Sequence, residues 1–222
     1  EVPAWVAGPR QDLQERLASG RTYDTALPMP FLTHNLNDMQ NDKVLGALRS
    51  FDKSNREEER VMVIFVPCYL DGKDGIFNQP YYDLLIGNDL SVYASYYEPW
   101  GYTPLESVAF HVPCITTSLS GFGRWANKVK GEGLRVKGEG LHSSLEDGVE
   151  VIERNDYNYN EVADGIVKAV LTYAAWDPNT VDEARRNAAS LAEKALWKHF
   201  IQQYYDAYDI ALQKAEIRKE TL

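Results

Sequence analysis

Short apolar runs recur along the chain, and segments with helical periodicity separate them. The runs lie at residues 2–7, 61–66, 90–95, 114–117 and 149–152. Runs of this length that are rich in β-branched and aromatic residues are typical of parallel strands that are buried on both faces of a sheet. The alternation of such runs with helical patterns predicts a three-layer α/β fold with a parallel sheet.

Helical periodicity is strongest near the end of the chain. Apolar and aromatic residues recur there at spacings of three and four, which predicts a long amphipathic helix over residues 195–218. We expect an α/β domain over residues 1–176 and a helical layer over residues 177–222. Shorter helices are predicted at residues 11–19, 37–51, 79–86, 104–111, 161–176 and 180–191, the last with Thr180 as its N-cap.

A tandem repeat of seven residues interrupts this alternation. The sequence Val-Lys-Gly-Glu-Gly-Leu occurs at residues 129–134 and again at residues 136–141. The repeat is too short for a solenoid and contains many glycines, which disfavour helices. It predicts an expanded surface loop or hairpin.

Residues 92–106 form the most informative stretch, because they indicate a strand, a tight loop and a helix start. Thr103, Pro104 and Glu106 match the signature of a helix N-terminus, with Thr103 as N-cap, proline at the first helical position and Glu106 closing a capping box. Such a loop, at the carboxyl end of a buried strand, is where open α/β sheets bind phosphorylated ligands.

The backbone of this loop is expected to bind an anion such as a diphosphate. The N–H groups of Gly101, Tyr102 and Thr103 would point outward, and the helix dipole favours negative charge there. A second loop, at residues 118–123, follows the next strand and should face the same cleft. Its glycines, Gly121 and Gly123, are equally well explained by tight turning.

The sequence EPWGYTPLE at residues 98–106 closely resembles the glycogen synthases, which are retaining glycosyltransferases with two Rossmann-like domains, the GT-B architecture. Residues 33–35, 61–67, 95–104 and 116–123 resemble the same family in the same order, and they favour its eukaryote-type branch. The resemblance implies the carboxyl-terminal, Rossmann-like half of an enzyme that transfers glucose from UDP-glucose, or less favourably ADP-glucose, to the end of glycogen or another α-glucan.

The resemblance also implies roles for individual residues. Glu98 would be the catalytic carboxylate that contacts the donor glucose, either as nucleophile or as electrostatic stabiliser. Glu106 would bind the ribose hydroxyls, and the ring of Tyr81, which lies 17 residues before Glu98, would stack on the nucleobase. The complete set of implied donor-binding residues is Tyr81, Trp100, Gly101, Tyr102, Thr103 and Glu106.

Some of these residues have structural alternatives. The capping box alone would explain Glu106, and Tyr81 could be an ordinary tyrosine of the core or surface. His34 could be catalytic, although a lone histidine in a turn is more often a structural hydrogen-bonding group. Glu98 is less ambiguous, because no capping role suits a carboxylate at a strand end that precedes Pro99.

Composition narrows the functional classes further. A net charge of −10 in 222 residues argues against binding to nucleic acid or to an anionic membrane. Cys68 and Cys114 lack metal-binding spacing and predict reduced thiols in a cytoplasmic protein. The four histidines are scattered, so neither a metal nor another cofactor is expected. No run of about 18 apolar residues or secretion signal is found.

The apolar run at residues 2–7 indicates that the chain begins within a fold. With the family resemblance, this implies a missing amino-terminal GT-B domain and an exposed aromatic face on the last helix, which favours self-association. The alternative function is a non-catalytic module for nucleotide-sugar binding, glucan binding or assembly. A dinucleotide oxidoreductase is a weaker alternative, because no GxGxxG motif follows the first strand.

One regulatory feature of the resembled family is poorly represented. In that family, an arginine-rich helix holds glucose 6-phosphate. Residues 180–189 of this chain contain only two arginines, Arg185 and Arg186, and two carboxylates, Asp182 and Glu183, shortly precede them. Two arginines beside two carboxylates make a poor anion site. We expect them to be ordinary helix residues.

Overall fold

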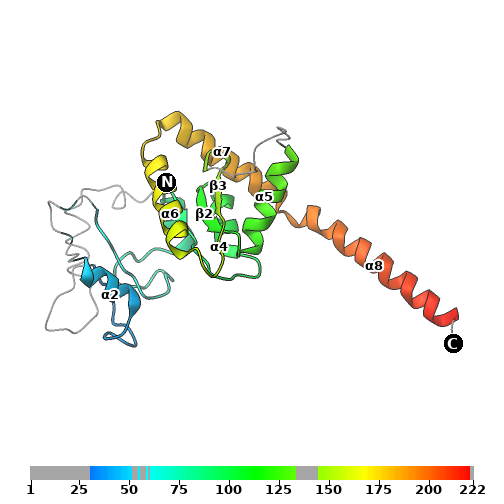
Figure 1. Cartoon of the computed structure of the whole chain (residues 1–222), viewed down its shortest axis with the longest axis horizontal. Coiled ribbons are helices and arrows are strands. Elements are labelled where there is room, and N and C mark those ends of the chain that lie inside the picture. The colour runs from blue at the N-terminus through cyan, green and yellow to red at the C-terminus, as the bar shows by residue number, and fades with distance from the viewer. Residues whose placement is uncertain (1–30, 52–54, 56–58, 60, 134–144, 221–222) are drawn as a thin grey trace. The chain divides into compact units, whose positions relative to one another are not determined.

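The computed structural model describes residues 31–51, 55, 59, 61–133 and 145–220. The chain divides into two compact units, Glu1–Gly87 and Asn88–Leu222, which are described separately (Figure 1). The strand predicted at residues 2–7 and the helix predicted at residues 11–19 lie outside the described residues. The predicted boundary between residues 176 and 177 stays a prediction.

The second unit contains a parallel sheet of three strands, β1 (Ser91–Val92), β2 (Cys114–Thr117) and β3 (Val149–Ile152), in the order β1-β2-β3. Cys114 of β2 aligns with Ser91 on one side and with Val149 on the other. The α/β fold class with a parallel sheet is therefore confirmed. The predicted strand at residues 90–95 is too long, because the N–H of Ser95 turns back to the carbonyl of Tyr93.

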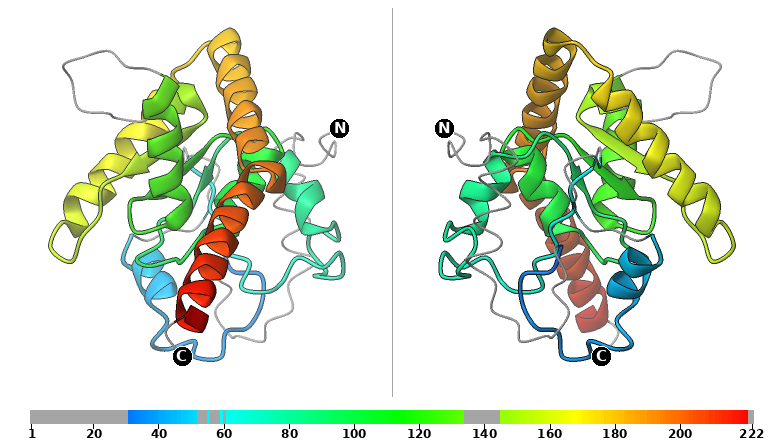
Figure 2. Two further views of the ribbon diagram at one scale, coloured as in Figure 1. Left: turned by 90° about the vertical axis from the view of Figure 1, so that its right-hand side faces the viewer. Right: turned by 90° about the vertical axis from the view of Figure 1, so that its left-hand side faces the viewer.

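Helices cover both faces of this sheet (Figure 2). On one face, Cys114 and Val149 pack against α4 (Tyr102–Ala109), α5 (Gly121–Gly133) and α7 (Pro178–Lys194). On the other face, Ile115 and Ile152 pack against α6 (Tyr159–Ala174), and the short η1 helix (Leu145–Asp147) adds Leu145 to the same cluster. Neighbouring residues of a strand thus serve opposite layers, which gives the predicted three-layer arrangement.

The helix starts differ from those predicted. The side chain of Asp177 caps α7 by accepting hydrogen bonds from the N–H groups of Asn179 and Thr180, with Pro178 in the first turn. The prediction that Thr180 is the N-cap is therefore wrong, because Asp177 lies before a proline that is already suited to the first helical position. The last helix, α8 (Trp197–Glu220), is exposed along most of its length beyond Ile201.

Residues 129–133 of the first copy of the tandem repeat belong to α5, which continues to Gly133. The prediction of a loop at residues 129–133 is therefore wrong. Buried Phe122 and Ala126 anchor this helix in the core, and packing of this kind outweighs the low helix propensity of glycine. The second copy lies outside the described residues.

The first unit contains α2 (Lys43–Ser50), capped by Asp42 instead of the predicted Asn37, and α3 (Tyr81–Ile86). Residues 61–66 form no strand of the described sheet: Phe65 makes a single parallel bridge to Leu32. The prediction of a central strand there is wrong. The side chain of Asn55 instead binds both the N–H and the carbonyl of Val63, where a neighbouring strand would otherwise pair.

Candidate functional site

The candidate site lies at the carboxyl ends of β1 and β2, where two loops join through main-chain atoms. Glu98 and Ser120 form a parallel bridge. The N–H of Glu98 donates to the carbonyl of Leu119 at 3.2 Å, and the N–H of Gly121 donates to the carbonyl of Glu98 at 3.1 Å. The two segments therefore meet at one sheet edge, as the sequence predicts, but the predicted loop at residues 118–123 is too long, because α5 already begins at Gly121.

Close approach of the backbones explains the glycines. A Cβ on Gly121 would lie 2.2 Å from the carbonyl oxygen of Pro99, and a Cβ on Gly123 would lie 2.5 Å from that of Thr117. Neither glycine has the positive φ that a glycine turn would require. The structure thus adds an explanation that differs from both tight turning and a cleft-facing role, namely close packing of the backbone at these two glycines.

The carboxylate of Glu98 is half-buried at this edge. The hydroxyl of Ser95 donates a hydrogen bond to its Oε2 at 3.0 Å. The carbonyl of Ser95 in turn accepts a hydrogen bond from the Thr117 hydroxyl at 2.7 Å. Glu98 is therefore held by its own loop and, one step away, by the end of β2.

Helix α4 starts at Tyr102, with Gly101 as its N-cap. Gly101 has a φ of 109°, and a Cβ there would lie 2.7 Å from the Ser120 hydroxyl. Thr103 is therefore the second helical residue instead of the predicted N-cap, and Pro104 is the third. Because Glu106 lies in the second turn, it cannot close a capping box. The capping explanation of Glu106 is therefore wrong, and its binding of ribose stays a prediction.

The two helix N-termini at this edge differ in how their N–H groups are used. At α5, the first N–H groups bind the carbonyls of Glu98 and Trp100, and the third donates to the Ser120 hydroxyl. No side chain caps α4, and the N–H groups of Tyr102 and Thr103 meet no acceptor within the described part of the chain. The α4 terminus is thus the one with donors left for an anion.

The Trp100 ring packs against other aromatic rings. Its centroid lies 6.2 Å from that of Phe122, 6.0 Å from that of Trp125 and 5.8 Å from that of Phe200 on α8. Trp100 and the exposed Tyr102 also line a hollow of about 450 Å³ beside the first turns of α8. The ring of Trp100 therefore holds α8 against the site loop, and its role in donor binding stays a prediction.

Tyr81 belongs to the first unit, whereas the other predicted site residues belong to the second. It is the first residue of α3 and is half-buried, with its ring centroid 5.3 Å from that of Tyr82. Its predicted stacking on a nucleobase stays a prediction.

Sequence reasoning missed Arg154, which follows β3. Its Nη1 donates to the carbonyl of Ala94 at 3.0 Å, and its guanidinium lies 4.8 Å from the ring centroid of Tyr96. The Tyr96 hydroxyl donates to Asp156, which raises the pKa of Tyr96. No local motif marks Arg154, because its partners lie about 60 residues earlier in the chain.

Other groupings of chemical interest are less suited to a site. His34 lies 3.8 Å from the Cys68 sulfur, but its Nδ1 lies 2.8 Å from the Thr33 hydroxyl and its Nε2 lies 2.8 Å from the carbonyl of Asp74. Burial, together with Asp74 and Asp71, raises the pKa of the Cys68 thiol, which disfavours the reactive thiolate. His34 is thus a structural hydrogen-bonding group.

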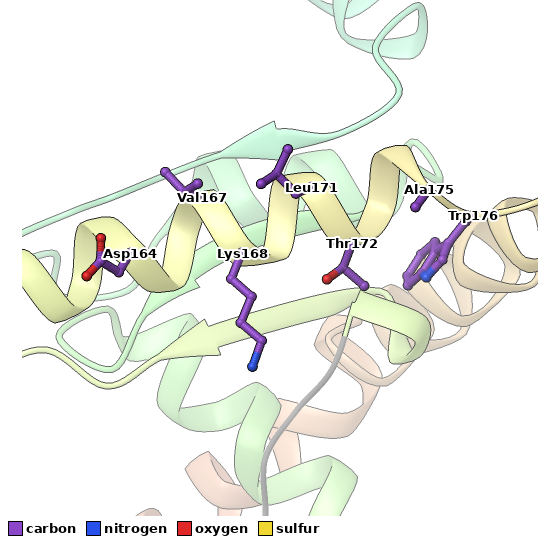
Figure 3. Close-up of a pocket in the computed structure, with 7 residues that line it drawn as sticks. All are labelled: Asp164, Val167, Lys168, Leu171, Thr172, Ala175 and Trp176. Atoms are coloured by element: carbon purple, nitrogen blue, oxygen red, sulfur yellow. The ribbon is translucent and has the colours of Figure 1, made fainter.

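A hollow of about 640 Å³ runs along α6 (Figure 3). The Lys168 side chain points away from Val167 and Leu171 in that view. The polar and apolar groups that line the hollow therefore do not converge on one ligand. Among the described residues, no cluster of histidine, cysteine or acidic side chains could hold a metal ion. None of the described helices is both long and apolar enough to cross a membrane.

Comparison with known proteins gives one family. A family model described as glycogen synthase matches residues 13–220. The chain is 31% identical to glycogen (starch) synthase isoform 1 of Saccharomyces cerevisiae over 213 residues, covering 91% of the chain and 27% of the yeast protein. It is 28% identical to glycogen (starch) synthase of Neurospora crassa over 186 residues, covering 84% of the chain and 25% of the fungal protein.

A shorter alignment of 102 residues with the liver glycogen (starch) synthase of Homo sapiens is 40% identical and covers 46% of the chain and 14% of the human protein. The chain thus spans about a quarter of the length of the yeast and Neurospora proteins.

Proposed function

Because this chain belongs to the glycogen synthase family, we propose that it forms the donor-binding half of a retaining glycosyltransferase. The complete enzyme transfers glucose from UDP-glucose to the non-reducing end of an α-1,4-glucan. One observation carries the proposal: the Glu98 carboxylate and the N-terminus of α4, which no side chain caps, lie on one short loop at the carboxyl edge of a parallel sheet.

The two groups suit the two charges that develop during glycosyl transfer. Positive charge grows on the sugar as the bond to the diphosphate breaks, and a fixed carboxylate such as Glu98 stabilises it. Negative charge grows on the leaving diphosphate, and the N–H groups of Tyr102 and Thr103 are donors for it. Gly101 lets the distal phosphate approach the backbone, because it has no side chain.

Two further residues bind the nucleoside in this proposal. Glu106 lies four residues after Tyr102, so the two side chains share one face of α4. The carboxylate of Glu106 accepts hydrogen bonds from the ribose hydroxyls. Tyr81 stacks on the base, and the resemblance of the site sequence to the eukaryote-type branch favours uracil over adenine in this proposal. A comparison of kcat/KM for UDP-glucose and ADP-glucose tests that preference.

The roles of the two glutamates are separated by substitution in the complete enzyme. Glu98→Gln should lower kcat by about 100-fold to 10,000-fold, because it removes the charge that opposes the developing positive centre. Glu106→Gln should mainly raise KM for UDP-glucose, by about tenfold. Glu161→Gln, an exposed carboxylate in the first turn of α6, is the control and should match wild type. A kcat for Glu98→Gln within about threefold of wild type would remove the catalytic role.

The second candidate is a non-catalytic module for nucleotide-sugar binding, glucan binding or assembly. It is favoured by the exposed aromatic residues of α8, which include Tyr204, Tyr205 and Tyr208. The two functions are distinguished by incorporation of labelled glucose into glycogen. If the complete polypeptide bound UDP-glucose but incorporated no glucose, the module would be the correct assignment.

A further inference from the structure

The main chain that carries Glu98 leaves the sheet several residues before Glu98 itself. Strand β1 ends at Val92, and the last ladder hydrogen bond runs from the N–H of Tyr93 to the carbonyl of Ile115 at 2.8 Å. The N–H of Ser95 then donates to the carbonyl of Tyr93 at 2.9 Å, which is a tight three-residue turn. Regular strand pairing therefore does not fix residues 94–97.

Side chains from the neighbouring strand ends fix these residues instead. Arg154 binds the carbonyl of Ala94 at 3.0 Å, and Thr117 binds the carbonyl of Ser95 at 2.7 Å. The third residue, Tyr96, lies under the Arg154 guanidinium and bonds to Asp156. Ser95 then holds the carboxylate of Glu98. Arg154 thus contacts Ala94 and Tyr96, the two neighbours of Ser95, whose hydroxyl holds Glu98.

Arg154 is itself held firmly. Its N–H donates to the Ser118 hydroxyl at 3.0 Å, and that hydroxyl lies 3.5 Å from the Arg154 carbonyl. The Nε of Arg154 is buried and has no hydrogen-bond partner among the described residues. An arginine with a buried, unsatisfied nitrogen is an inefficient source of stability. Its geometry suits a positioning role better.

We propose that Arg154 is a positioning residue for Glu98, which it orients by tying the end of β3 to the Ala94 carbonyl and the Tyr96 ring. The inference rests on the proposed function only in naming Glu98 as the catalytic group. Small displacements of such a group lower turnover steeply, while donor affinity depends on the separate contacts of α4.

Substitution in the complete enzyme tests this role. Arg154→Ala should lower kcat by about tenfold or more and leave KM for UDP-glucose within about threefold, because the donor contacts remain. Added guanidinium ion should restore part of the lost turnover in Arg154→Ala. The kcat of Arg154→Lys should lie between those of the wild type and Arg154→Ala, since an ammonium can reach one carbonyl but cannot cover the Tyr96 ring in the same way.

Arg185→Ala is the matched control. Arg185 also binds a carbonyl next to β1, that of Asn88 at 3.0 Å, but it does so at the amino end of the strand. Its removal should disturb β1 comparably and leave kcat within about twofold of wild type. An equal loss of kcat in both variants would show that Arg154 acts only through stability, and would overturn the proposal.

Hydrogen exchange gives a readout that does not depend on activity. In Arg154→Ala, exchange of the amides at residues 94–98 should rise about tenfold, and in Arg185→Ala it should not. Unchanged exchange, or a kcat within about twofold of wild type, overturns the proposal. A tenfold rise in KM with unchanged kcat also overturns it, since Arg154 would then contact the donor. If the wild-type enzyme transfers no glucose, the proposed function fails, while the exchange result still decides whether Arg154 fixes the loop.

Discussion

Gly121→Ala is the substitution that most directly tests how the two site loops are joined. A Cβ at this position would lie 2.2 Å from the carbonyl oxygen of Pro99, against 3.4 Å or more for ordinary contact. The obstacle is main-chain oxygen, which cannot rotate away as a side chain would. One loop must therefore withdraw from the other by about 1 Å, since a smaller shift would leave the Cβ and the oxygen closer than van der Waals contact.

The magnitude follows from the hydrogen bonds that span the gap. Three main-chain bonds would be stretched or lost: Glu98 to Leu119, Gly121 to Glu98, and Phe122 to Trp100. At about 1 kcal/mol net for each bond, the free energy of unfolding should fall by about 3 kcal/mol. Turnover should fall by about 100-fold, because Glu98 moves with its loop.

Denaturant unfolding and steady-state kinetics of the complete enzyme measure both effects. Gly165→Ala is the control in the same unit: its Cβ would meet only Ile152, at an ordinary 3.4 Å. This glycine lies inside α6, so alanine should be neutral or should stabilise by about 0.5–1 kcal/mol. The reasoning is refuted if Gly121→Ala unfolds within about 0.5 kcal/mol of wild type and keeps turnover within about twofold.

Three other predictions concern regulation, pH and the isolated chain. Millimolar glucose 6-phosphate should change the rate of the complete enzyme by less than about twofold, because Arg185 already binds Asn88 and Asp89; a tenfold activation that Arg185→Ala combined with Arg186→Ala abolishes would contradict this. Burial raises the pKa of Asp74, but hydrogen bonds from the N–H groups of Phe77, Ile76 and Asn78 outweigh it and hold that pKa below its usual 3.8. The ionised Asp74 therefore stabilises the fold above pH 3.8, and the stability difference between wild type and Asp74→Asn should shrink in acid-unfolding experiments as the pH falls through the lowered pKa. The 222 residues expressed alone should incorporate no glucose from UDP-glucose into glycogen, as measured with labelled donor; measurable incorporation would contradict the expectation that the site needs a further domain.

Strands whose side chains serve two buried layers could be predicted closely from the sequence. Residues 114–117 and 149–152 match β2 and β3 in full, because an apolar run flanked by turn residues has few other ways to be buried. Residues 61–66 have the same pattern but form one bridge only. The side-chain amide of Asn55 binds both the N–H and the carbonyl of Val63 there, and the hydrophobic pattern carries no information about this contact.

The site shows the same division between local and distant causes. The meeting of the Glu98 loop with the segment at residues 118–123 follows from the order of strands in a parallel sheet, although β1 ends at Val92, well before Glu98. The start of α4 does not, because Gly101 caps it in a backbone conformation fixed by packing against Ser120. Arg154 could not be found from local sequence either, since its contacts depend on how β1 and β3 are placed in space.

The bridge between Glu98 and Ser120 also bears on how the specificity of this site can change. Main-chain bonds and the Ser120 hydroxyl join the two loops, and the side chain of Tyr97, which is 76% exposed, takes no part in these bonds. Position 97 is therefore open to substitution without loss of the frame that holds Glu98. A library of variants at this position should retain folded, soluble protein in most members, so that selection acts on the choice of sugar donor or acceptor instead of on survival of the fold. The loop thus offers one exposed position at which specificity can evolve, while Glu98, the residues that hold it and the glycines at the close backbone contacts stay fixed.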